Sequence, residues 1–170
     1  MFILSEGDMV LREFVETDIQ NKLEWINNPE NNLYLHYDIP LIYDKTLEWF
    51  RNKNNDARLD LVIVIDGIPV GLLGLLHIDV NNRKAEFYIS MGVSKYKNRG
   101  IATRATLLLI KYSFTTLKLH KIYLTTDGDN ILAQKLFERV GFKKEGIFED
   151  DLYHRGQYIQ RIRYGLVNRN

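Results

Sequence analysis

Cysteine is absent from the 170-residue sequence, and proline occurs only three times. The lack of cysteine excludes disulfides, thiolate zinc sites and a cysteine nucleophile, and it fits the reducing cytoplasm, where we expect the protein to act. Long apolar runs are also absent, because the longest, at 61–65 and 72–76, are too short to span a bilayer. Residues 1–8 have neither the basic start nor the apolar core of a secretory signal. We therefore expect one soluble domain over residues 1–170 with no membrane contact.

Net charge is nearly absent as well, since 23 Lys and Arg residues against 22 Asp and Glu residues leave +1. A chain with so little net charge has no long-range field to attract nucleic acid, and we expect no nucleic-acid partner. The spacing of the four histidines matches no metal site, so we expect no metal. The hydrophobic content of 45% is typical of a globular domain with a real core.

Hydrophobic periodicity divides the chain into strand-like and helix-like segments. Alternation, or a short apolar or β-branched run, between turn residues predicts strands at 9–14, 59–65, 69–78, 85–93, 121–126, 142–153 and 158–166. Helical spacing predicts helices at 17–26, 44–50, 100–117 and 130–140, the first capped by Thr17 or Asp18 and the second by Asp44. This order predicts an α/β (α+β) fold, with a mixed, mostly antiparallel sheet of about seven strands flanked by about four helices.

Positive charge gathers at one predicted strand-to-helix junction, residues 94–100. Gly100 and Ala102 leave the backbone there open to close approach, and Thr103 adds a hydroxyl donor. The basic residues of this segment are Lys95, Lys97, Arg99 and Arg104. A helix start favours anions through its unpaired amides and its dipole. The segment therefore predicts a phosphate or pyrophosphate site; the alternative is an ordinary turn with solvated basic residues.

Two motifs together resemble those of the GNAT superfamily of N-acetyltransferases. Lys97-Asn98-Arg99-Gly100-Ile101-Ala102 is similar to the acyl-CoA signature Q/R-x-x-G-x-G/A, with Lys97 at a position that is usually Gln or Arg. The segment 130–142 is similar to the family's N-x-x-A-x-x-L-Y-E-K-x-G-F. Neither G-x-G-x-x-G after a first strand nor G-x-x-x-x-G-K-[ST] occurs. The resemblance covers residues 9–166 and implies a GNAT-like fold with acetyl-CoA as co-substrate.

The resemblance also implies a set of cofactor contacts. In such enzymes the fourth strand of the sheet separates from the fifth, and pantetheine lies in the gap along the fourth. The implied cofactor residues are Met91, Gly92, Val93, Lys97, Asn98, Arg99, Gly100, Ile101, Ala102, Thr103, Asn130, Phe137 and Arg139, with Lys135 as an alternative to Arg139. Asn130 has a second interpretation as a helix cap, and the two roles are compatible.

Acetyl transfer requires a base for the amine and a polarised carbonyl. Glu86 is the candidate base, because many family members carry a glutamate at this position. Strand alternation places Tyr88 and Ser90 on the same face as Glu86. The alternative is that this face is simply exposed to solvent. A backbone N–H near Val93 is the expected source of polarisation.

The proton for the leaving thiolate has no obvious source. The family's usual acid is the tyrosine of L-Y-E-K, and that position is Phe137 here. Tyr153 is the candidate substitute, with Tyr123, Tyr88 or bulk water as alternatives. The same substitution leaves open a different class of function, a non-catalytic acyl-CoA-binding sensor.

The acceptor is expected to be a small-molecule amine. Residues 25–30 and 43–50 resemble the GNAT branch that contains ribosomal-protein, spermidine and nucleotide-amino-sugar acetyltransferases. Aromatic residues at 32–38 suit stacking on a sugar or base, or form a lid over the core. We expect an amino group on a nucleotide-activated sugar, with a polyamine or a protein N-terminus as alternatives.

Three further features of the sequence bear on acceptor and assembly. A polyamine site would need several carboxylates in one cleft, which Glu145, Glu149, Asp150 and Asp151 could provide. His36 and His77 stay open as substrate contacts. Exposed edge strands at the C-terminus make a homodimer reasonable.

Overall fold

Eight strands form one mixed sheet in the computed structural model, which describes residues 2–170; Met1 lies outside the described part. The strands are β1 (Ile3–Glu6), β2 (Met9–Glu13), β3 (Leu59–Ile65), β4 (Ile68–Asp79), β5 (Lys84–Met91), β6 (Lys121–Asp127), β7 (Lys143–His154) and β8 (Gln157–Val167). Their order across the sheet is β1-β2-β3-β4-β5-β6-β8-β7. Neighbours pair antiparallel throughout residues 2–170 except β5 and β6, which are parallel. The mixed, mostly antiparallel sheet expected from the sequence is confirmed.

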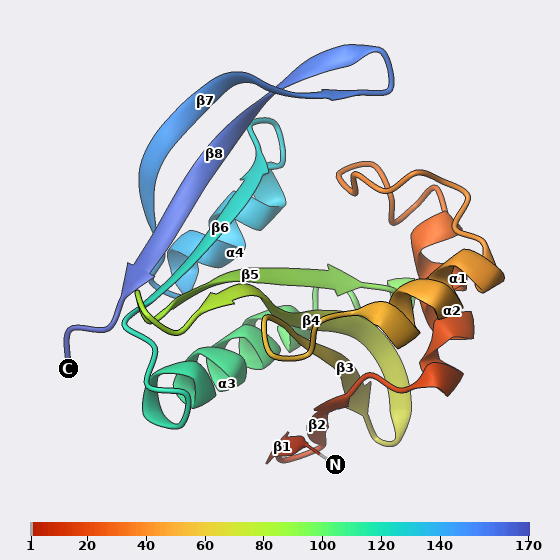
Figure 1. The fold of residues 1–170 in the computed structure, drawn as a ribbon, viewed down its shortest axis with the longest axis horizontal. Helices are drawn as coiled ribbons and strands as arrows, with labels where there is room; N and C mark the ends of the chain where they lie inside the picture. The colour runs from red at the N-terminus through yellow and green to blue at the C-terminus, as the bar shows by residue number, and fades with distance from the viewer. Residues whose placement is uncertain (1) are drawn as a thin grey trace.

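Helices cover both faces of this sheet (Figure 1). They are α1 (Ile19–Asn27), α2 (Tyr43–Asn52), α3 (Ile101–Thr115) and α4 (Ile131–Arg139), with short 3-10 turns at Glu16–Asp18 and Ser94–Tyr96. Strand alternation assigns the faces, since Val62 packs with α1 and α2 whereas Ile63 packs with α3. The two expected side-chain caps are wrong: Ile42 precedes α2, and the Asp18 carboxylate binds Arg12 instead of the start of α1.

Strand β1 was not predicted by the sequence. It is only four residues long and mostly exposed, so it lacks the apolar alternation of the other strands. It pairs with β2 through a tight turn at Gly7, whose φ of +59° suits glycine. The sheet therefore has one more strand than the sequence indicates, at its N-terminal edge.

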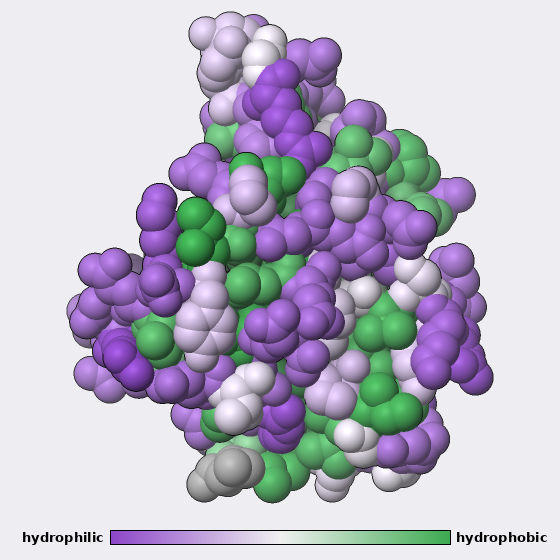
Figure 2. All heavy atoms as spheres, turned by 90° about the vertical axis from the view of Figure 1, so that its right-hand side faces the viewer, coloured by the Kyte–Doolittle hydropathy of each residue, from purple (hydrophilic) through white to green (hydrophobic). Residues whose placement is uncertain are grey.

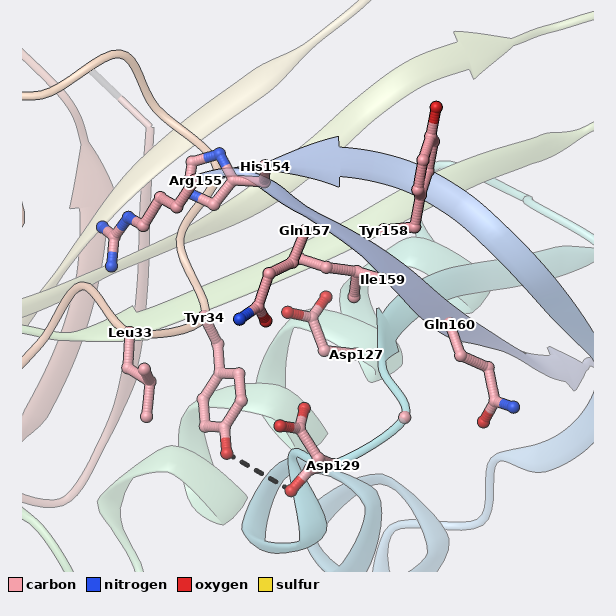
Figure 3. A pocket seen from close by; sticks show the side chains of 11 residues that line it. Leu33, Tyr34, Asp127, Asp129, His154, Arg155, Gln157, Tyr158, Ile159 and Gln160 are labelled. Atoms are coloured by element: carbon pink, nitrogen blue, oxygen red, sulfur yellow. Dashed lines mark hydrogen bonds between the residues drawn. The ribbon is translucent and has the colours of Figure 1, made fainter.

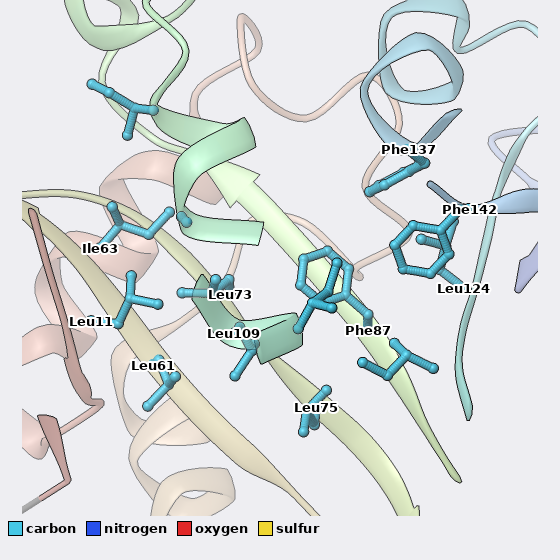
Figure 4. Packing of buried hydrophobic residues seen from close by; sticks show 14 of the residues in the cluster. Leu11, Leu61, Ile63, Leu73, Leu75, Phe87, Leu109, Leu124, Phe137 and Phe142 are labelled. Atoms are coloured by element: carbon cyan, nitrogen blue, oxygen red, sulfur yellow. The ribbon is translucent and has the colours of Figure 1, made fainter. Parts of the chain in front are cut away.

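The main core lies between the sheet and helices α3 and α4 (Figure 4). Leu73 and Leu109 are fully buried where α3 crosses the sheet. Three phenylalanines pack where α4 meets β5, with ring centroids of Phe87 and Phe137 6.1 Å apart and of Phe137 and Phe142 5.8 Å apart. This aromatic cluster holds α4 beside β5, which positions the second motif next to the strand that precedes the first.

Strands β5 and β6 separate soon after they begin (Figure 1). They pair only from Lys84 to Glu86 on β5 and from Lys121 to Tyr123 on β6. Beyond Glu86 the sheet opens into a gap whose two edges are β5 and β6. The separation expected between the fourth and fifth strands of the family is present, numbered one higher here because of β1. None of the helices formed by residues 2–170 has the length and apolar character that crossing a bilayer requires.

Candidate functional site

A cavity of about 360 Å³ lies in the gap between β5 and β6. We call it the gap cavity. Its walls come from β5, β6, α4, β8 and the segment between α1 and α2, and they include Tyr34, His36, Tyr37, Glu86, Tyr88, Ile89, Thr126, Asp127, Asn130, Ala133, Phe137 and Arg161. The structure thus brings together Glu86, Asn130 and Phe137, which lie far apart in the sequence.

The β5 backbone presents unpaired groups to this gap. Gly92 N–H donates to the Val70 carbonyl at 2.8 Å, which fixes the alternation of the β4–β5 ladder. In an antiparallel ladder every second residue turns its N–H and C=O away from the partner strand. Ile89 and Met91 are these residues, and both lie beyond the part of β5 that pairs with β6. Their backbone groups therefore face the gap, where a pantetheine chain or a thioester carbonyl could pair with them.

Of the backbone N–H groups near Val93, that of Val93 itself is not free to polarise the carbonyl. Val93 N–H donates to the Val70 carbonyl at 3.3 Å, the same oxygen that accepts from Gly92. A second hydrogen bond fixes Gly92, because its carbonyl accepts from Asn31 Nδ2 at 3.0 Å. A Cβ on Gly92 would lie 2.2 Å from two carbons of the Trp25 indole, so glycine is required there by contact with α1. Gly92 and Val93 anchor the end of β5 and do not face the gap.

A second cavity, of about 460 Å³, adjoins the start of α3, and we call it the helix-start cavity. It is lined by Met91, Tyr96, Lys97, Asn98, Gly100, Ile101, Ala102, Thr103, Leu132, Ala133, Lys135, Leu136 and Arg139. Gly100 caps α3 with φ +75° and no side-chain hydrogen bond, so the amides of the first helical turn stay unpaired. Ala133 lines both cavities, which places the two end to end along α4.

The charges at the helix start differ in part from the expectation. Lys97 lines the cavity, and its Nζ donates to Asn31 Oδ1 at 2.5 Å. Arg139 and Lys135 reach the same cavity from α4. Arg104 does not, because it pairs with Asp8 at 2.7 Å beside the β1–β2 turn. Arg99 also lies outside the lining and places its guanidinium 5.7 Å from the centre of the Tyr96 ring.

Asn130 begins α4 as its cap, with Oδ1 accepting from the Ala133 N–H at 3.3 Å. The cap interpretation is confirmed, and the side chain also lines the gap cavity. Phe137 is 6% exposed and joins the core cluster, while one side of it borders the same cavity. Its apolar ring therefore occupies a site wall where the family motif has a hydroxyl.

None of the three candidate tyrosines brings its hydroxyl to the gap. Tyr153 is 64% exposed near the tip of the β7–β8 hairpin, with its ring 5.0 Å from that of Tyr158, so its expected role as the acid is not supported. Tyr88 lies over Gly74, and its hydroxyl donates to Asp60 Oδ1 at 2.7 Å on the side away from β6. Tyr123 lies under the Arg163 guanidinium at 3.8 Å and does not line the cavity.

Glu86 stands at the edge of the gap cavity. Its side chain is 26% exposed, and Oε2 lies 3.4 Å from Nε2 of His77, which is itself 73% exposed. The simple solvent-exposed alternative for this face is therefore wrong, because Glu86 and Tyr88 both line the cavity. Glu86 contacts the cavity and solvent at once, which suits a group that passes protons to water.

A third cavity, of about 620 Å³, opens beside the β7–β8 hairpin (Figure 3), and we call it the hairpin cavity. Tyr34 and Asp127 line both this cavity and the gap cavity. The Tyr34 hydroxyl donates to the Asp129 carbonyl at 3.3 Å, which joins the α1–α2 segment to the turn before α4. The two cavities are thus neighbours, and an elongated acceptor could extend from one into the other.

A polar cluster between these cavities was missed by sequence reasoning. His36 Nε2 contacts Asp127 Oδ1 at 2.8 Å, and Arg161 Nε lies 3.9 Å from the same oxygen. The His154 ring stands edge-on to His36, with centroids 4.8 Å apart. These residues come from four separate segments, so no local motif could have indicated that they meet.

The acidic residues of β7 do not form a carboxylate cleft. Glu145 pairs with Lys121 at 2.6 Å, and Glu149 accepts from Gln160 at 2.9 Å, while Asp150 and Asp151 are exposed. The projecting hairpin is covered mostly by hydrophilic residues (Figure 2). The carboxylates that do line the gap and hairpin cavities are Glu86, Asp127 and Asp129.

Buried charged groups beneath α1 and α2 hold the Tyr88 side chain, which lines the gap cavity. Asp60 accepts two hydrogen bonds of 2.7 Å from Arg58 and a third from Tyr88. Burial alone would raise the pKa of Asp60, but these bonds outweigh it and lower that pKa. Burial, aided by the nearby Asp60 charge, raises the pKa of Tyr88 well above its ordinary value, so Tyr88 stays a neutral donor.

Comparisons with known proteins agree with this arrangement. Residues 8–143 match the family model described as an acetyltransferase (GNAT) domain. Spermidine N(1)-acetyltransferase of Escherichia coli strain K12 is 34% identical over 122 residues, 72% of this chain but only 62% of that protein. The chain thus matches less than two thirds of the length of this relative.

Solved structures show the same similarity over nearly the whole chain. A spermidine N-acetyltransferase from Vibrio cholerae in complex with CoA and spermine has a TM-score of 0.87 and 26% identity, covering 94% of this chain and 95% of that one. A dodecameric structure of spermidine N-acetyltransferase from the same organism has a TM-score of 0.80 and 26% identity, covering 94% of each chain. The resemblance seen in the sequence motifs is therefore confirmed at the level of the fold.

Proposed function

Because the chain belongs to the GNAT acetyltransferase domain family, we propose that it transfers an acetyl group from acetyl-CoA to a primary amine. The observation that carries this proposal is the pair of neighbouring cavities that share Ala133 as a lining residue. One offers unpaired helix amides and basic side chains, and the other offers unpaired strand backbone and a carboxylate. This arrangement matches the two ends of a long phosphorylated thioester.

The donor fits the helix-start cavity through its charge. The pyrophosphate would lie on the amides of Ile101, Ala102 and Thr103, where the helix dipole favours an anion. Lys135 and Arg139 would meet the nucleotide phosphates from α4. The pantetheine arm would then run past Met91 into the gap, with Asn130 on its other side.

The transfer step would take place in the gap cavity. Ile89 N–H would polarise the thioester carbonyl, since it turns away from β4 and lies beyond the part of β5 that pairs with β6. Glu86 would accept a proton from the incoming ammonium, directly or through water, and release it to solvent. The amine nitrogen then attacks the carbonyl carbon, the C–N bond forms, and the C–S bond breaks as the thiolate leaves.

For the acceptor we favour a polyamine over the amino sugar expected from the sequence. The relatives described above are named for spermidine, and none of them supports a nucleotide-sugar acceptor. The adjoining gap and hairpin cavities suit a long, thin amine better than a single compact ring. One amino group would lie at Glu86, and a more distant one near Asp129 in the hairpin cavity.

The oligomeric state of this chain is a further part of the proposal. A dimer was expected from the exposed edge strands, but one similar structure is dodecameric. We propose that this chain forms an oligomer, whose size light scattering of the purified protein would give.

Two measurements test the function. Calorimetric titration with acetyl-CoA measures donor binding, and a thiol-release assay then screens spermidine, spermine, a nucleotide-linked amino sugar and a peptide with a free N-terminus. We expect acetyl-CoA binding and CoA release with spermidine or spermine. Release only with the sugar or the peptide would overturn the polyamine assignment. Binding without release over every amine would favour the non-catalytic sensor, and no binding would overturn both.

A further inference from the structure

Three buried side-chain nitrogens lack a hydrogen-bond partner in residues 2–170, and all three lie in one cluster. They are His36 Nδ1, His154 Nε2 and Arg161 Nε. His36 joins the other two, because its ring stands against His154 and its Nε2 binds the carboxylate that Arg161 also approaches. Buried polar atoms are nearly always paired in folded proteins, so three unpaired atoms in one place indicate a functional site.

The contact with Asp127 sets which ring nitrogen of His36 carries the hydrogen. Asp127 is 4% exposed and accepts hydrogen bonds through its carboxylate, so His36 Nε2 carries the hydrogen and donates it at 2.8 Å. In the neutral ring Nδ1 is then a lone-pair acceptor, and it is this atom that is buried and unpaired. A carboxylate that holds an imidazole by one nitrogen leaves the other oriented to move a proton.

The overall reaction supplies the proton that such a group would move. Acetylation of an ammonium removes two protons from nitrogen, because R–NH3⁺ becomes an amide N–H. One proton leaves to solvent, and the second ends on the sulfur of CoA. Glu86 contacts solvent and suits the first transfer, whereas the buried Nδ1 of His36 suits the second.

We propose that His36, held by Asp127, takes the second proton from the attacking nitrogen and gives it to the leaving thiolate. This inference rests on the proposed acetyl transfer and names the group that replaces the missing tyrosine. His36 lines the same cavity as Phe137, so its ring borders the space in which the transfer would take place. As the C–S bond breaks, the electron pair goes to sulfur and the proton follows from Nδ1, which returns to its neutral form.

The groups around His36 are compatible with this proton transfer. Asp127 on β6 stabilises the imidazolium formed between the two transfers, while Arg161 on β8 lies 3.9 Å from Asp127 and limits that stabilisation. His154, at the end of β7, contacts the ring edge-on and lines the hairpin cavity, not the gap cavity. We therefore assign His154 no part in the proton transfer.

The test compares His36→Gln with the wild type, using spermidine or whichever amine the panel identifies. Glutamine keeps an N–H near the position of Nε2 for Asp127 but has no basic nitrogen. We expect kcat to fall at least tenfold, because general acid–base groups contribute roughly 10²- to 10⁴-fold. Acetyl-CoA affinity should change less than about threefold, since His36 lies outside the helix-start cavity.

A second variant separates catalysis from structure. His36→Ala opens space for a free imidazole, and added imidazole should restore part of the lost kcat. The matched control is His120→Gln, at an exposed histidine that lines none of the three cavities, and it should keep kcat within about threefold. If His36→Gln keeps the wild-type kcat, or if His36→Ala loses activity that imidazole does not restore, the proton-transfer role is wrong while the acetyltransferase proposal stands. If the wild type acetylates no amine, both proposals are overturned.

Discussion

Glu86 and His36 differ in their access to water, and this difference divides the proton work of the site between them. Glu86 is about a quarter exposed, whereas the Nδ1 atom of His36 is buried. A proton that must reach solvent needs the first kind of group, and one that must stay within the site needs the second. Phe137 lines the cavity where the family motif has a tyrosine, and its ring has no hydroxyl that could take part in these transfers.

At Glu86 we expect the Glu86→Gln variant to lower turnover at least tenfold near neutral pH. Glutamine keeps the size and hydrogen bonding of the side chain but cannot accept the amine proton. The measurement is CoA release at saturating acetyl-CoA and amine, with Glu149→Gln as the control for an exposed strand carboxylate outside the three cavities. An unchanged rate would remove Glu86 from the mechanism.

Among the elements, the parts of the site that the sequence predicted are the local ones. The start of α3 follows from Gly100 and its neighbours, because helix capping and backbone amides depend on a few consecutive residues. The start of α4 follows from Asn130 in the same way. The order of strands was also predictable, since each predicted strand carries its own local signal, either alternation or a short apolar run between turn residues.

Long-range contacts could not be read in this way. The pairing of Val93 with Val70 and the meeting of His36 with Asp127 join residues from separate segments, and no periodicity encodes which carbonyl or carboxylate a distant residue reaches. Tyr88 is a further example, since its position on β5 was correct but its hydroxyl turns to Asp60 on β3. Topology brings these atoms together only once the sheet has formed.

Helix α4 allows its cap and its ligand contact to be separated. Asn130→Ala removes the side-chain acceptor of the Ala133 N–H and should cost about 1 kcal/mol of unfolding free energy. Asn130→Asp keeps that acceptor and thus the stability, but it replaces the amide donor that would face pantetheine with an anionic oxygen. We expect acetyl-CoA affinity to fall in both variants, measured by calorimetry beside urea unfolding. Wild-type affinity in Asn130→Asp would show that Asn130 acts only as a cap.

At the scale of the whole molecule, the face beneath α1 and α2 holds a charge that opposes folding. Lys22 is buried with its Nζ 3.7 Å from the centre of the Trp49 ring, and burial lowers its pKa from 10.5 to about 8 despite the nearby Asp60. Between these two pH values the unfolded chain binds a proton that the folded chain does not. Stability must therefore rise with pH across this window.

The pH dependence of unfolding would reveal this contribution. Below about pH 8 Lys22 is charged in both states, and the folded state carries the full cost of burying it, roughly 3 kcal/mol from the size of the shift. Lys22→Met keeps an unbranched stem against Trp49 without the charge. We expect the variant to be more stable than the wild type at pH 7, by roughly 1–3 kcal/mol once the lost contact with the ring is allowed for.

Urea unfolding at pH 7, 8, 9 and 10 provides the measurement, because the two stabilities should converge as pH rises toward 10. The series stops there, since burial raises the pKa of Tyr88. Above pH 10 the folded state therefore keeps protons that the unfolded state loses, and stability falls for a separate reason. Two curves that stay parallel from pH 7 to 10 would mean that Lys22 titrates alike in both states and that its burial costs the fold nothing.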